Sequence, residues 1–133
     1  MQKTLLATAA SIMLLSGAAF AADLKFAPGG DAKFNWKSYE DFKAAHADLK
    51  GQTLTIFGPW RGEDEALFQS VLAYFADATG VNVRYSSSEN YEQQIVIDTQ
   101  AGSPPNIAIL PQPGLLADLA AKGFLVPPGA ITA

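Results

Sequence analysis

Seven side chains suited to binding a polar ligand stand in three short loops, and each loop follows an apolar segment of the sequence. They are Trp60, Arg61, Glu63, Asp64, Ser88, Glu89 and Gln112. An exposed indole can stack on the apolar face of a sugar ring, because sugar C–H groups favour a π surface. A guanidinium presents a planar fork of donors to pairs of hydroxyl groups, and carboxylate, hydroxyl and amide groups also exchange hydrogen bonds with hydroxyls. These residue types predict a site for a neutral polar ligand.

The candidates of the first loop also have a structural interpretation, which the sequence leaves open. Trp60 would then pack on the edge of a sheet, and Arg61 would form a salt bridge to Glu63, Asp64 or Glu65. These acids would mainly complement the positive end of a helix macrodipole.

The candidates of the other two loops have structural alternatives of the same kind. Ser88 and Glu89 precede a predicted helix, where a short polar side chain can cap the free N–H groups. Gln112 stands between two prolines, and its amide would then hydrogen-bond within that turn.

Catalysis finds little support in the residue types. The chain has no cysteine and one histidine, His46, which lies far from the three loops, so a zinc site is not expected. The glycines at 58 and 62 lack the lysine ending of a phosphate-binding loop. Glu63 and Asp64 are adjacent, and adjacent helical residues point in different directions, so they would not flank one glycosidic bond. We therefore expect no enzyme activity, no metal and no cofactor.

Three strands and three helices must position these loops. The predicted strands cover residues 54–57, 81–85 and 107–110, and the helices that follow them cover about 63–79, 91–101 and 113–122. Strands that alternate with helices form a parallel sheet, because parallel neighbours need a long crossover connection. The three loops then lie at the C-terminal edge of the strands, where open α/β sheets bind ligands.

The pattern of apolar residues predicts which helix faces are buried. For the first of these helices the predicted buried residues are Leu67, Phe68, Val71, Leu72, Phe75 and Ala78. For the last helix they are Leu115, Leu116, Leu119 and Ala120. Capping boxes are predicted at Ser38 and at Asn90, and Gly80 suits the left-handed end of the first helix.

The N-terminus predicts export. Residues 1–21 combine a positive start, an apolar segment at 5–15 that is too short to span a bilayer, and a small-residue cleavage pattern at 19–21. A lipid anchor would require a cysteine, so we expect a protein with no membrane anchor, and the periplasm as its location.

Residues 22–50 are interpreted as an extension with one helix, held by Phe34 and Trp36, and 51–133 as the main domain. The net charge is −4 and the basic residues form no continuous stripe, so we expect no nucleic-acid partner.

Several segments resemble the extracellular solute-binding proteins of sugar ABC importers, family 1. They are residues 49–60, the F-x-x-x-T-G-x-x-V segment at 75–83, and residues 93–95, 101–108 and 111–115, the last three being similar to the α-glucoside-binding subgroup. The resemblance covers residues 36–128.

The resemblance implies an α/β, periplasmic binding protein-like fold of type II. The chain would be a partial N-terminal lobe with three parallel strands and flanking helices, truncated relative to the much longer family members. It further implies a bilobed protein that binds a sugar, such as an α-glucoside or another oligosaccharide, and delivers it to the permease subunits of an ABC importer in the inner membrane. By position, residues 60–64 match the first loop of the family's cleft, 88–89 the second and 112 the third.

Two other interpretations remain open from sequence. One is a fragment of a secreted carbohydrate-active enzyme that uses Glu63 or Asp64 as a catalytic carboxylate. The other is a stand-alone, flavodoxin-like interaction domain.

Overall fold

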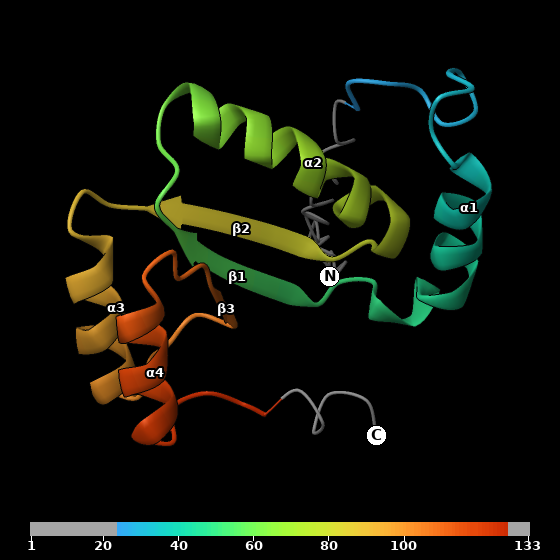
Figure 1. The fold of residues 1–133 in the computed structure, drawn as a ribbon. Helices are drawn as coiled ribbons and strands as arrows, with labels where there is room; N and C mark the ends of the chain where they lie inside the picture. Colours follow the sequence, from blue (N-terminus) through green and yellow to red (C-terminus); the bar gives the residue numbers. More distant parts are fainter. Residues whose placement is uncertain (1–23, 128–133) are drawn as a thin grey trace, which may run out of the picture.

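The computed structural model describes residues 24–127, and Figure 1 shows their fold. The elements in chain order are α1 (Trp36–Ala45), a short 3-10 helix η1 (Ala47–Leu49), β1 (Thr53–Gly58), α2 (Glu63–Thr79), β2 (Asn82–Ser87), α3 (Tyr91–Gln100), β3 (Ile107–Ala108) and α4 (Pro113–Ala121). The predicted signal peptide, residues 1–21, lies outside the described residues. The division between an extension and a main domain at residue 50 stays a prediction.

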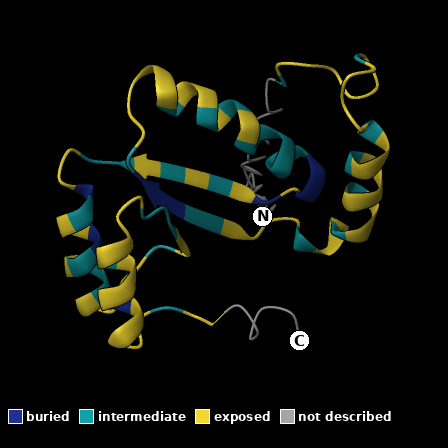
Figure 2. Cartoon of the chain, in the orientation of Figure 1, coloured by how far each residue is buried: buried dark blue, intermediate teal, exposed yellow. Residues whose placement is uncertain are grey.

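The three strands form one parallel sheet in the order β2-β1-β3. The central strand β1 pairs with both neighbours, and α2 covers one face of the sheet whereas α3 and α4 lie on the other (Figure 1). This arrangement confirms the predicted α/β architecture. The alternation of half-buried and exposed residues along β2 is the pattern of a strand covered on one face (Figure 2).

Strand β3 is shorter than the predicted 107–110. The Ile109 N–H still donates to the carbonyl of Phe57 over 2.9 Å, which extends the pairing by one bond. The carbonyl of Ile109, however, accepts a hydrogen bond from the Tyr91 hydroxyl at 2.5 Å. A side chain therefore replaces the strand partner at this point, and the chain turns towards α4.

The buried cluster on the α3 side is built around Phe57, Tyr91 and Ile95. The rings of Phe57 and Tyr91 meet edge to face with centroids 5.7 Å apart, and Ile95 is 2% exposed. Half-buried side chains of α4 and β3 complete it, so this cluster fixes α3 against the end of β1 that carries the loops.

The buried faces of α2 and α4 are narrower in the structure than the sequence pattern predicted. On α2, Phe68 and Leu72 turn inward as expected, but Leu67 and Val71 are 56% and 64% exposed. On α4, Leu119 is buried and Leu116 is 46% exposed. Each helix meets the sheet along a narrow stripe, and a three-stranded sheet is too small to cover the flanking positions as well.

Helix α1 lies at the end of the sheet opposite to the loops (Figure 1). It begins two residues before the predicted cap, because the Asn35 side chain accepts a hydrogen bond from the Ser38 N–H at 3.2 Å. The predicted capping box at Asn90 is also wrong, since no side-chain hydrogen bond caps α3. Of the two predicted anchors, Trp36 packs near Tyr74 with ring centroids 6.2 Å apart, whereas Phe34 is 46% exposed.

Candidate functional site

The three loops converge on one edge because the strand ends are in register. Gly58, the last residue of β1, pairs with Ser87, the last residue of β2, and Phe57 pairs with Ala108 of β3. Residues 59–62, 88–90 and 109–112 therefore leave the sheet side by side, and we call them together the loop edge. All seven predicted site residues lie in these loops or in the first turn of α2.

Arg61 and Glu89 connect the first two loops of this edge. Their Nη1 and Oε1 atoms lie 3.6 Å apart, with side chains 55% and 83% exposed. The structural alternative for Arg61, an ion pair with an acid of α2, is not the one seen. Because an exposed ion pair of this kind is weak, both groups remain able to exchange partners with hydroxyl groups of a ligand.

Trp60 combines packing with exposure. Its ring centroid lies 4.5 Å from that of Phe68, and its main-chain carbonyl accepts a hydrogen bond from the Tyr85 hydroxyl at 3.0 Å. The residue nevertheless stays 36% exposed. One side of the indole is thus supported by the protein, and part of the ring surface is open to solvent.

The acids at the start of α2 divide into two groups. Glu63 and Asp64 are exposed, and within residues 24–127 their carboxylates form no salt bridge. Glu65 is half-buried and accepts hydrogen bonds from Ser87 Oγ at 3.3 Å and from Gln69 Nε2 at 2.9 Å. Glu65 is not among the seven residues predicted from the sequence. The signal was its i, i+4 spacing from Gln69, which places the two side chains on one face of α2.

The second and third loops present their polar groups without using them as caps. Ser88 is half-buried, and α3 begins after Asn90 without a side-chain cap. Gln112 precedes Pro113 in an extended conformation, and its exposed amide forms no capping bond to α4. The structural alternatives for Ser88, Glu89 and Gln112 therefore find no matching contact in the part of the chain that the structure describes.

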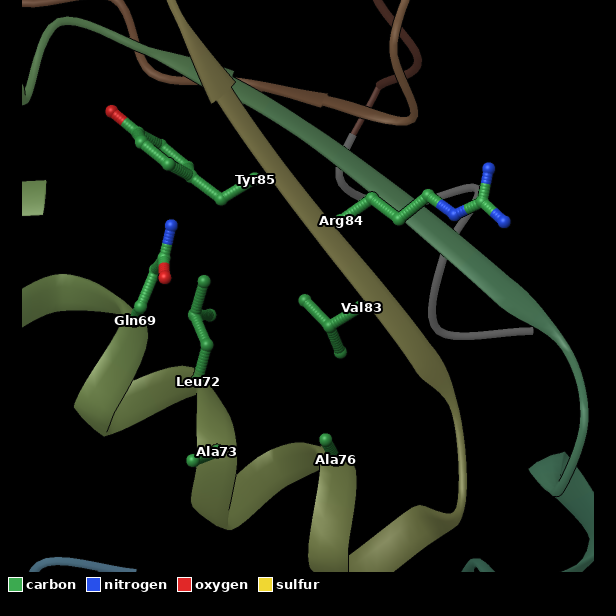
Figure 3. Close-up of a pocket in the computed structure, with 7 residues that line it drawn as sticks. All are labelled: Gln69, Leu72, Ala73, Ala76, Val83, Arg84 and Tyr85. Carbon is green, nitrogen blue, oxygen red and sulfur yellow. The ribbon is translucent and has the colours of Figure 1, made fainter. Parts of the chain in front are cut away.

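A groove of about 470 Å³ lies next to this edge, between α2 and β2. Its lining residues are Gln69, Leu72, Ala73, Ala76, Val83, Arg84 and Tyr85. Figure 3 shows Val83 and Tyr85 pointing towards α2, whereas the guanidinium of Arg84 points away from it. None of the seven predicted site residues lines the groove, so it is separate from the loop edge, although Tyr85 borders both.

No group of three or more His, Cys, Asp or Glu side chains is placed to hold a metal ion among residues 24–127. None of the helices in that range has the length and apolar character that crossing a membrane requires.

Comparison with known proteins identifies the family. Residues 58–133 match the family model described as bacterial extracellular solute-binding protein. The chain is 70% identical over 135 residues to the alpha-glucosides-binding periplasmic protein AglE of Rhizobium meliloti, an alignment that covers 97% of this chain and 29% of that relative. It is 37% identical over 86 residues to the osmoprotective compounds-binding protein GgtB of Synechocystis, covering 65% of this chain and 20% of that relative.

The chain thus spans less than a third of the length of either relative. No solved structure matches it. The family match covers more than half of the sequence, and the family's periplasmic-binding-protein fold agrees with the parallel α/β sheet observed. This chain belongs to the bacterial extracellular solute-binding protein family.

Proposed function

We propose that this chain is part of the substrate-binding component of an ABC importer, and that its substrate is an α-glucoside or a related oligosaccharide. The observation that carries the proposal is the 70% identity to a relative named for binding α-glucosides in the periplasm. The predicted export signal and the similarity to that relative support the periplasm as its location, and the permease subunits of the importer are its expected protein partners.

The loop edge supports this function by its chemistry. The partly exposed indole of Trp60 offers a stacking surface for a sugar ring. Arg61 donates to ligand hydroxyls and Glu89 accepts from them, each giving up part of a weak ion pair. Gln112 adds an exposed amide from the third loop.

The remaining candidates have supporting roles in the proposed site. Glu63 and Asp64 are exposed acceptors at the start of α2, and Ser88 supplies a hydroxyl from the second loop, beside the first. Together the seven residues form one wall of a ligand cleft. In the proposed whole protein a second lobe closes on this wall by a hinge movement.

Binding is favoured over the glycosidase alternative. A glycosidase needs two carboxylates that flank the scissile bond at a set separation. Glu63 and Asp64 are consecutive residues of the first turn of α2, so their side chains diverge. Family membership also replaces the alternative of a stand-alone flavodoxin-like domain.

The proposal is tested in a chimera in which this chain replaces the segment of the Rhizobium meliloti AglE protein that it matches. We expect calorimetric titration to detect binding of at least one of maltose, trehalose and sucrose, and no binding of the β-linked disaccharide cellobiose. A folded chimera that binds none of the three α-glucosides would refute the proposed substrate class.

A further inference from the structure

We propose that Tyr85 is a positioning residue for Trp60, and that it sets the affinity of the loop edge for its ligand. The inference rests on the proposed function, in which Trp60 stacks on a sugar. Tyr85 belongs to β2 and lies 25 residues after Trp60, yet its hydroxyl donates to the Trp60 carbonyl at 3.0 Å. A side chain of the edge strand thus holds the main chain of the first loop.

A second contact connects Tyr85 to the indole itself. The Tyr85 ring meets Phe68 edge to face with centroids 5.2 Å apart, and Phe68 packs against Trp60 at 4.5 Å. The three aromatic rings form a continuous chain of contacts from the edge strand to the partly exposed indole. Tyr85 therefore acts on Trp60 twice, through the backbone and through Phe68.

Gly58 leaves the space through which the Tyr85 side chain extends to the first loop. Tyr85 pairs in register with Ile56, two residues before Gly58, so its ring must extend along β1 to meet the loop. A Cβ atom at Gly58 would lie 3.0 Å from the Tyr85 hydroxyl oxygen and 3.1 Å from Ile109 Cδ1. The absence of a side chain at position 58 leaves the space that the Tyr85 hydroxyl occupies.

The first loop needs such support because its own sequence leaves the backbone free to adopt several conformations. Gly62 follows Trp60 closely and has φ of 61°, a conformation that glycine adopts without strain. Fixing a side chain in its bound geometry beforehand lowers the entropy that binding must otherwise overcome. A tyrosine hydroxyl is protonated and able to donate at neutral pH, and burial raises the pKa of Tyr85 further.

The first experiment uses the full chain and the emission of Trp60. The chain has two tryptophans, so a Trp36→Phe background isolates Trp60. In that background Tyr85→Phe removes the hydroxyl and keeps the ring. We expect a red-shifted emission and faster quenching by acrylamide. Tyr74→Phe is the matched control, because the Tyr74 hydroxyl also bonds to main chain, at Phe26, and lies away from the loops.

The second experiment measures sugar affinity by calorimetry in the chimera described above. When the hydrogen bond that holds the loop beforehand is lost, the cost of ordering the loop falls on binding, so we expect Tyr85→Phe to weaken the affinity by up to about fivefold, with no change for Tyr74→Phe. Gly58→Ala, which obstructs the hydroxyl, should reproduce both effects. Far-UV circular dichroism confirms that each variant is folded.

The outcomes separate this inference from the proposed function. If Tyr85→Phe changes neither the Trp60 emission nor the affinity, the positioning role is wrong even when Trp60→Ala abolishes binding. If Trp60→Ala leaves the affinity unchanged, the stacking role of Trp60 is wrong. An altered Trp60 emission in Tyr85→Phe would then show that Tyr85 positions Trp60 without any effect on binding. That result would overturn the part of the inference that concerns affinity.

Discussion

Arg61, in the loop after β1, reaches Glu89, in the loop after β2, with 3.6 Å between Nη1 and Oε1. The two residues are 28 positions apart in the sequence and meet because β1 and β2 end in register, Gly58 opposite Ser87. Their contact joins the first two loops of the loop edge across the strand ends.

This ion pair should matter for binding and not for folding. Arg61→Ala should change the free energy of unfolding by less than about 0.5 kcal/mol, because exposed pairs contribute little. In the chimera it should weaken sugar binding at least about tenfold, the effect of losing about 1.4 kcal/mol of charge-assisted hydrogen bonding. Urea denaturation and calorimetry measure the two quantities.

Lys37→Ala is the matched control for Arg61→Ala. It breaks the exposed Lys37–Asp41 pair on α1, which lies at 2.5 Å and far from the loops. Its effect on unfolding should be similarly small, and sugar affinity should stay unchanged. Equal losses of affinity in the two variants would contradict a specific role for Arg61.

The cluster under the loop edge should account for a large share of the stability. Ile95 is 2% exposed and packs in the core with Phe57 and Tyr91. Ile95→Ala should lower the free energy of unfolding by about 2–5 kcal/mol, because it removes buried methyl groups and leaves a cavity. Ile97→Ala, on the same helix but 57% exposed, should change it by less than about 0.5 kcal/mol. Similar values for the two variants in urea denaturation would be inconsistent with the described core.

Replacement by alanine should have opposite effects on stability at two glycine positions. Gly80 ends α2 with φ of 69°, and a Cβ there would lie 2.9 Å from Lys50 Cγ. Gly80→Ala should therefore destabilise the protein by about 1–2 kcal/mol. Gly114 lies in the first turn of α4 with open space around it, so Gly114→Ala should stabilise by up to about 1 kcal/mol. Thermal unfolding of both variants tests the pair, and a stabilising Gly80→Ala would contradict the left-handed helix end.

Asp77 should make the attachment of α1 to α2 depend on pH. Hydrogen bonds from the Tyr39 hydroxyl and from Lys43 Nζ, the latter at 2.9 Å, hold the pKa of Asp77 below its ordinary value of 3.8. A carboxylate whose pKa is lowered by folding stabilises the folded state above its ordinary pKa. That contribution disappears as the pH falls through the lower folded value.

The comparison of wild type with Asp77→Asn isolates this effect from the other carboxylates. The stability difference between the two proteins should be constant from pH 7 to pH 5 and should shrink between about pH 4 and pH 2. Urea denaturation at a series of pH values measures it. A difference that stays constant down to pH 2 would show that Asp77 does not carry the attachment.

The sequence was sufficient to predict the order of elements and the parallel sheet. Apolar segments such as 54–57 and 81–85 are short, and the helical spacing of Phe68, Leu72 and Phe75 is regular. The convergence of the loops followed from strand polarity alone. These features depend on local pattern, which one sequence contains.

The remaining features depend on tertiary contacts that no local pattern encodes. The exposure of Leu67 and Val71 follows from the small width of the sheet. The cap of α1 came from Asn35 because its side chain, rather than that of Ser38, reaches the free N–H groups. The contact of Tyr85 with Trp60 spans two strands and requires the space at Gly58. Long-range geometry of this kind became visible only in the fold.

The proposed function depends most directly on Trp60 as the stacking surface of the loop edge. The decisive measurement is calorimetric titration of the chimera and its Trp60→Ala variant with the best-bound α-glucoside, with Trp36→Phe as the control tryptophan variant. We predict that Trp60→Ala weakens binding at least about thirtyfold, as expected for an aromatic hot spot worth about 2 kcal/mol, and that Trp36→Phe binds as the unmodified chimera does. An unchanged affinity in a folded Trp60→Ala variant would contradict the proposed stacking of Trp60 on the sugar.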